Sequence, residues 1–94
     1  PTNAAFAALP PATLNSLLAN PAQLAQVLLF HVTSGQVLSS QLTNGQNVTT
    51  LRTGARPLVV NLTGGVKIDT ANVVAADVRG LNGVVHVIDS VLLP

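Results

Sequence analysis

The chain has 94 residues, 48% of them hydrophobic and 7% charged, and two phenylalanines are its only aromatic residues. So much aliphatic surface can offset chain entropy and excludes intrinsic disorder, yet no apolar run approaches the ~20 residues of a membrane-spanning helix. Four basic and three acidic side chains leave a net charge of +1. Without a basic cluster or stacking aromatics, this composition disfavours nucleic-acid binding and predicts one soluble globular domain.

The first third of the chain predicts short helices. Thr2 or Asn3 can cap a first helix, which ends near Leu9 before two prolines. A second helix shows an apolar stripe at spacing i, i+3 and i+4, formed by Leu14, Leu17 and Leu18.

A third helix begins at Asn20-Pro21, an N-cap followed by proline at the first helical position. Its stripe continues to i+7 and consists of Leu24, Val27, Leu28 and His31. The spacing therefore predicts that His31 faces the core side of this helix.

From Gly35 onward, glycine, asparagine and threonine separate short segments rich in valine and leucine, which is typical of a strand meander. The expected strands are residues 47–52, 58–62, 66–69, 72–78 and 84–93. Residues 36–42 are ambiguous between a short helix and an edge segment.

The register of one hairpin can be predicted. A two-residue turn at residues 64–65 would set aliphatic residues against charged ones. A three-residue loop, 63–65, instead pairs Leu62 with Val66 and Val60 with Ile68. It keeps one face apolar and leaves Asn61, Lys67 and Asp69 on the wetter face, so we expect the three-residue loop.

The last expected strand, residues 84–93, has aliphatic residues on both faces, which is typical of a central strand covered on both sides. His86 and Asp89 lie three residues apart, so a regular strand points them to opposite faces. Ser90 shares a face with His86, but four residues of strand separate their α-carbons by ~13 Å. We expect His86 and Asp89 to be hydrogen-bonded structural groups.

No other pattern in the sequence indicates catalysis or metal binding. A long-range triad through His31 lacks a Gly-x-Ser-x-Gly elbow to present a nucleophile. The two histidines and three aspartates show no ligand spacing, and cysteine and glutamate are absent. The chain is therefore expected to be no enzyme and to need no cofactor. Two Asn-x-Thr sequons, at Asn47 and Asn61, are candidate N-glycosylation sites, against the alternative that they occur by chance.

Three stretches together resemble a fasciclin-type domain over the whole chain. PTNAAFAALP (residues 1–10) is similar to the family's Pro-Thr-(Asp/Asn)-x-Ala-Phe segment. VLLFHV (27–32) is similar to its central Tyr-His motif, with Phe30 in place of the tyrosine. NGVVHVIDSVLLP (82–94) is similar to its second marker segment, and all three stand in the family's order.

The resemblance implies an α+β fold in which short helices precede a twisted antiparallel β-sandwich or wedge. Residues 1–94 would form one fasciclin domain that lacks its N-terminal helices and first strand. The implied function is non-catalytic adhesion or matrix interaction, in an extracellular, cell-surface or periplasmic setting, with the thylakoid lumen as an alternative. Implied partners are other proteins, namely an adhesion receptor, matrix proteins or subunits of a host complex. The resemblance implies no nucleic acid, and contact with a membrane only at its periphery.

The family's contact positions correspond to Phe30, His31, Asp77 and Val78. The lost tyrosine hydroxyl at Phe30 and the changed context of Asp77 weaken the case for animal-type integrin recognition. A buried, hydrogen-bonded His31 competes with the contact role, and Asp77 could equally bond backbone amides. Two other functions remain open: an accessory or scaffold subunit docked onto a larger, membrane-associated assembly, and a small-ligand binder.

Overall fold

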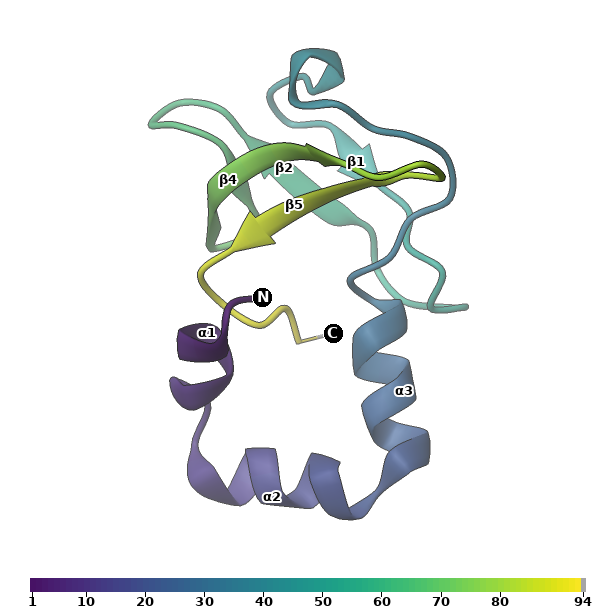
Figure 1. The fold of residues 1–94 in the computed structure, drawn as a ribbon, viewed down its shortest axis with the longest axis vertical. Coiled ribbons are helices and arrows are strands. Elements are labelled where there is room, and N and C mark those ends of the chain that lie inside the picture. Colours follow the sequence, from purple (N-terminus) through teal and green to yellow (C-terminus); the bar gives the residue numbers. More distant parts are fainter. Residues whose placement is uncertain (94) are drawn as a thin grey trace.

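A computed structural model describes residues 1–93 of the chain and shows an α+β fold (Figure 1). Three helices come first, then a short 3-10 helix and five strands. The elements are α1 (Asn3–Ala7), α2 (Pro11–Ala19), α3 (Pro21–Leu29), η1 (Ser39–Gln41), β1 (Asn47–Val48), β2 (Leu58–Asn61), β3 (Lys67–Ile68), β4 (Ala71–Arg79) and β5 (Val84–Ile88). The predicted α+β class is confirmed, and η1 resolves the ambiguity over residues 36–42 in favour of a short helix.

The helices begin where the caps and prolines predict. The Thr2 hydroxyl accepts a hydrogen bond from Ala5 N at 3.0 Å, and the Asn20 amide oxygen accepts one from Gln23 N at 3.2 Å. Helices α2 and α3 both start at proline, whose fixed φ suits the first helical turn and whose missing N–H costs nothing there.

The predicted apolar stripes are wrong in part. Figure 1 shows the three helices as an open U below the sheet, with α2 farthest from it. No residue of α2 is buried, and Leu18 is 63% exposed because no other described element covers that side. In α3 Val27 is buried but Leu28 is 45% exposed. The helix ends at Leu29, so His31 follows it and does not lie within it.

The strands form an antiparallel sheet in the order β1-β2-β3-β4-β5. In the β2–β3 hairpin Val60 pairs with Ile68 and Asn61 with Lys67, which confirms the predicted register. Gly65, at φ 99°, occupies a backbone conformation in the reversal that other residues rarely adopt. The pairing of β4 with β5 shifts register twice, at irregularities between Val73 and Ala75 and between Ala75 and Val78.

The expectation that residues 84–93 form one central strand is wrong. Strand β5 ends at Ile88 and pairs only with β4, at the end of the sheet order. Val85 is 60% exposed, so the second aliphatic face is covered only in part. The strand expected at 47–52 is also shorter, because the chain turns at buried Thr50, whose hydroxyl accepts a hydrogen bond from Arg52 N.

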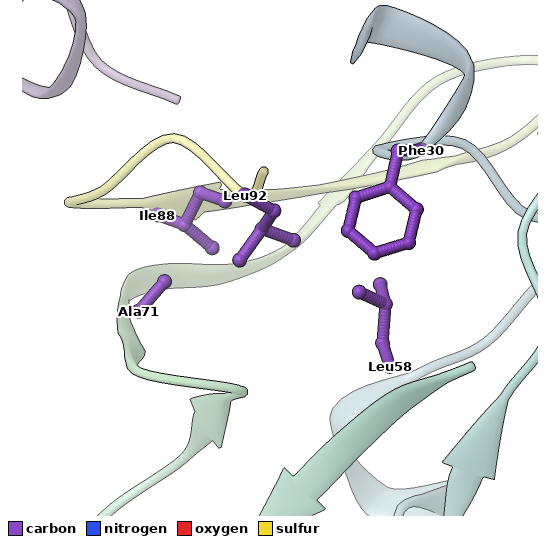
Figure 2. Packing of buried hydrophobic residues seen from close by; sticks show 5 residues of the cluster. All are labelled: Phe30, Leu58, Ala71, Ile88 and Leu92. Atoms are coloured by element: carbon purple, nitrogen blue, oxygen red, sulfur yellow. The ribbon is translucent and has the colours of Figure 1, made fainter. Parts of the chain in front are cut away.

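The core lies between the curled sheet and the end of α3. Figure 2 shows its five buried side chains, which come from α3's C-cap, β2, β4, β5 and the C-terminal segment. They are Phe30, Leu58, Ala71, Ile88 and Leu92. This small cluster joins every major part of the chain except α1 and α2, so it also fixes the position of the candidate site.

Candidate functional site

His31 links the end of α3 to the C-terminal segment. Its Nε2 lies 2.8 Å from Leu92 N, and its Nδ1 lies 2.7 Å from the carbonyl oxygen of Val27. A backbone N–H can only donate, so Nε2 accepts and the proton is on Nδ1, which donates to Val27. Burial lowers the pKa of His31 below its ordinary value of 6.5, although the bond to Val27 opposes this. The imidazole of His31 is therefore neutral, and each of its ring nitrogens bonds a backbone group.

Phe30, the other residue of the Tyr-His position, is fully buried. Its ring lies in the core beside Leu58 and Leu92 (Figure 2). The Arg56 guanidinium lies 5.3 Å from the ring centroid, a cation–π distance. In this conformation the Phe30 ring offers no surface to a partner.

Arg56 is itself held by Asp69. Arg56 Nη1 lies 2.9 Å from Asp69 Oδ2 and forms an ion pair with it. The other carboxylate oxygen, Asp69 Oδ1, accepts a hydrogen bond from Val59 N at 2.9 Å. The cation over Phe30 is thus fixed by a carboxylate that is also bonded to β2.

Asp77 lies in β4 at the second irregularity, with φ 59°. Its Oδ1 accepts a hydrogen bond from Ser39 N at 2.8 Å, and its Oδ2 accepts one from the Ser39 hydroxyl. Its own N–H donates to His86 Nδ1 at 3.2 Å, and His86 Nε2 donates to the Val37 carbonyl oxygen at 2.6 Å. We call these three residues, Ser39, Asp77 and His86, the latch cluster. It joins β4, β5 and the segment that leads into η1.

The latch cluster has the composition of a catalytic triad but not its connections. In a triad the histidine accepts the serine proton and the aspartate bonds the histidine. Here the Ser39 hydroxyl donates to Asp77, and both nitrogens of His86 are occupied by backbone groups. The hydroxyl and N–H of Ser39 hold the pKa of Asp77 below 3.8, so this carboxylate is an anion and not a base near neutral pH. The cluster therefore has no activated nucleophile.

Asp89 makes a reciprocal contact with Asn72 at the other end of the β4–β5 pair. Its two carboxylate oxygens accept hydrogen bonds from Asn72 N at 2.8 Å and Asn72 Nδ2 at 2.9 Å, and its N–H donates to the Asn72 carbonyl oxygen. These bonds hold the pKa of Asp89 below 3.8. Asp89 thus bonds the segment after β5 to the beginning of β4.

Val78 differs from the other three predicted contact residues because its side chain is 48% exposed. It pairs in register with Val85, which is 60% exposed. Val74 in the same strand is 58% exposed, and Leu81 at the hairpin turn is completely exposed. We call these four aliphatic residues, Val74, Val78, Leu81 and Val85, the hairpin surface. It is an exposed apolar region of the kind that marks interaction sites.

The structure also contains a cavity of about 380 Å³ between β5, the β1–β3 part of the sheet and residues 31–42. Its walls are mainly aliphatic, and His31 and His86 line it. The ring nitrogens of both histidines are already bonded to backbone groups, so neither presents a free nitrogen to a ligand.

Asn47 and Asn61, the two sequon asparagines, are both exposed. The Asn61 side-chain oxygen accepts hydrogen bonds from the N–H and the hydroxyl of Thr63 within its own sequon. Glycosylation of either residue remains a prediction. Within residues 1–93 there is no group of three histidine or acidic side chains placed to hold a metal ion. None of the helices described here combines the length and the apolar character needed to cross a membrane.

The structure thus separates the residues that the sequence grouped as contacts. Phe30 and His31 lie in or against the core, Asp77 lies in the latch cluster, and Val78 lies on the hairpin surface. Sequence reasoning missed Ser39, which lay in the segment of ambiguous structure. It also missed the exposed partner of Val78, because residues 84–93 were expected to be covered.

The family model for the fasciclin domain matches residues 1–94, which is the whole chain. An uncharacterised protein of Synechocystis sp. is 37% identical over 93 residues, covering 99% of this chain and 68% of that protein. Rabbit (Oryctolagus cuniculus) transforming growth factor-beta-induced protein ig-h3 is 37% identical over 94 residues, which are 14% of its length. Immunogenic protein MPB70 of Mycobacterium bovis is 38% identical over 96 residues, 47% of its length. The chain thus spans between a seventh and about two thirds of these three relatives.

Proposed function

Because the chain belongs to the fasciclin domain family, we propose that it is an adhesion or matrix-interaction module that binds other proteins through the hairpin surface. Fasciclin-domain proteins mediate protein interactions, and their members are extracellular or cell-surface proteins. The finer assignment supposes that this chain also acts outside the cytoplasm, on a receptor or matrix protein. Catalysis has no part in the proposed function.

The observation that carries the proposal is the contrast between the polar groups and the hairpin surface. Every aspartate and histidine side chain bonds another part of the same chain. These residues are His31, Asp69, Asp77, His86 and Asp89. The hairpin surface instead offers four exposed aliphatic side chains from β4, β5 and the turn between them. Binding energy at protein interfaces comes mainly from a few such apolar residues that become desolvated.

Among the four predicted contact residues, the proposal gives direct contact to Val78. Asp77 then acts by holding the backbone beside Val78, and Phe30 and His31 act only through the core. This division follows from burial: Phe30 is 0% exposed and Val78 is 48% exposed.

The experiment immobilises the chain and measures binding of three probes by surface plasmon resonance: fibronectin, type I collagen and a second copy of the chain. The double variant Val78→Ser/Val85→Ser removes the apolar side chains from two paired positions of the hairpin surface. We expect it to raise Kd at least about tenfold, which corresponds to roughly 1.4 kcal/mol.

Val59→Ser is the matched control, because Val59 is 44% exposed in β2, outside the hairpin surface. It is expected to leave Kd within about twofold, as surface changes away from an interface do. The proposal is rejected if none of the probes binds, or if the control weakens binding as much as the double variant.

The exposed helices favour a second candidate, an accessory subunit docked onto a larger assembly. Helix α2 has no buried residue, and the chain leaves Leu18 63% and Leu28 45% exposed. Sedimentation velocity on the dilute chain separates the two candidates. A stable, soluble monomer contradicts the docked subunit, whereas a chain that stays in solution only with a partner contradicts the free adhesion module.

A further inference from the structure

The latch cluster lies directly beneath the hairpin surface. Asp77 precedes Val78 in β4, His86 follows Val85 in β5, and Val78 and Val85 are register partners. The hydrogen bond from Asp77 N to His86 Nδ1 therefore ties the β4 backbone next to Val78 to the side chain of the residue that follows Val85. The bond therefore lies next to the proposed contact surface.

The bond requires a neutral imidazole. His86 Nδ1 accepts the Asp77 N–H, and the Nε2 proton is donated to the Val37 carbonyl oxygen. A proton added to Nδ1 would place two N–H groups against each other at a site where one must accept.

A protonated His86 has an alternative partner within the same cluster. The Asp77 carboxylate is ionised and is held by the N–H and hydroxyl of Ser39. Arg79 is the other charged group near His86 on β4, and it also acts on Asp77. Residues 37–42 carry no charge, and His31 is the only other titratable side chain that lines the cavity beside His86. Asp77 is thus the anion that an imidazolium at His86 can recruit.

We propose that the latch cluster makes the hairpin surface pH-dependent. In the neutral state Asp77 bonds Ser39, and its N–H bonds His86, which holds the hairpin base to residues 37–39. When His86 gains a proton, the Asp77 carboxylate moves from Ser39 to the imidazolium. The Ser39 N–H and hydroxyl are released, and the backbone beneath Val78 and Val85 rearranges. The inference rests on the proposed function: the partner is bound near neutral pH and released in acid.

The free chain tests the latch without any partner. Proton–nitrogen NMR spectra and amide exchange are followed from pH 8 to pH 5, together with the imidazole resonances of the two histidines. We expect the Ser39 and Asp77 amides to change with the same midpoint as the His86 imidazole, and their exchange protection to fall at least about tenfold. The proposal is overturned if His86 titrates and these amides do not respond.

The amide of Leu92 is an internal control, because it bonds His31 and not His86. If the Leu92, Ser39 and Asp77 amides all change at one midpoint that differs from that of His86, the transition is general unfolding and the latch is refuted. His86→Gln removes the titration and retains a side-chain N–H for Val37, so it should abolish the transition at Asp77. A transition that persists in His86→Gln contradicts the proposal.

Ser39→Ala serves if His86→Gln does not fold. It removes only the hydroxyl bond to Asp77, so the carboxylate is released more easily and the midpoint should move to higher pH. An unchanged midpoint contradicts the exchange of partners.

The binding measurements at pH 7.5 and pH 5.5 then separate the two proposals. Binding through the hairpin surface with a pH-independent Kd refutes the latch and leaves the proposed function intact. If the latch cluster responds to pH but the chain binds none of the probes, the structural latch stands and the proposed binding function is refuted.

Discussion

The substitution His31→Phe tests the link between α3 and the C-terminal segment. Phenylalanine keeps the ring volume beside the core but cannot accept the Leu92 N–H or donate to Val27. The Val27 carbonyl oxygen keeps a bond from Phe30 N, so the main loss is an unpaired Leu92 N–H. Leaving one partly buried donor unsatisfied costs about 1–3 kcal/mol. For a domain of this size, a loss of about 2 kcal/mol lowers Tm by about 8–16 °C.

The measurement is urea unfolding of wild type and variant, followed by circular dichroism, with the free energy of unfolding extrapolated to water. His31→Gln is the control, because its side-chain oxygen retains an acceptor for Leu92 and should recover part of the loss. A free energy within about 0.5 kcal/mol of wild type, the range of ordinary surface substitutions, would refute a structural His31. If such a variant lost probe binding, His31 would be a contact residue.

The same bonds determine how stability depends on pH. Burial lowers the pKa of His31 in the folded chain below the 6.5 of an exposed histidine, so the unfolded chain binds the proton more readily. The contribution of His31 to stability is therefore complete above pH 6.5 and is lost as the pH falls below that value. Denaturant titrations between pH 8 and pH 5 should show a smaller decline in His31→Phe than in wild type; an equal decline in both would contradict the assignment.

Three further predictions concern the core and the carboxylates. Leu58→Ala should lower the free energy of unfolding by about 2–5 kcal/mol, because the leucine is 93% buried in the core cluster that includes Phe30. A smaller loss, measured by urea titration, would contradict its core role. Arg56→Ala should lower the free energy of unfolding by about 1 kcal/mol, because the half-exposed guanidinium is paired with Asp69. The loss should be smaller in 1 M NaCl, which screens the pair, and a loss that salt does not change would exclude the ion pair. Since the pKa values of Asp77 and Asp89 are held below 3.8, both stabilise the fold above that pH, and the stability should fall as the pH drops further. Asn72→Ala should reduce the part of this acid sensitivity that is due to Asp89.

The sequence predicted the fold most accurately where a local rule decides the structure. Capping residues determine where α1 and α3 begin, and the aliphatic pairing of Val60 with Ile68 selects one register in the β2–β3 hairpin. Both depend on residues that are near each other in the chain. The extent of β5 depends instead on what lies beside it, and alternation alone cannot distinguish a covered aliphatic face from an exposed one.

The candidate site was predictable only in part, for the same reason. The parity argument for His86 and Asp89 assumed a strand that includes Asp89, whereas β5 ends at Ile88. The structure nevertheless gives the two residues separate partners, with His86 bonded to Asp77 N and Val37, and Asp89 bonded to Asn72. The partner of Asp77 could not be found, because Ser39 lies 38 residues away and the bond forms only when the segment before η1 packs against β4. Phe30 showed the converse limit: its place in a motif suggested contact, whereas the structure buries its ring.

The backbone at Asp77 explains why an acidic residue stands inside a mainly aliphatic strand. With φ 59° it lies in the left-handed region, which costs most residues energy and which aspartate and asparagine tolerate best. The register irregularity between Ala75 and Val78 places it there, and bonds to Ser39 and His86 compensate the unfavourable conformation. Val78 then follows a reorientation of the strand and pairs with Val85, with both side chains largely exposed. In the proposed function, the Asp77 carboxylate contributes to binding by shaping the surface beside it, and a change at His86 would affect the partner without touching it.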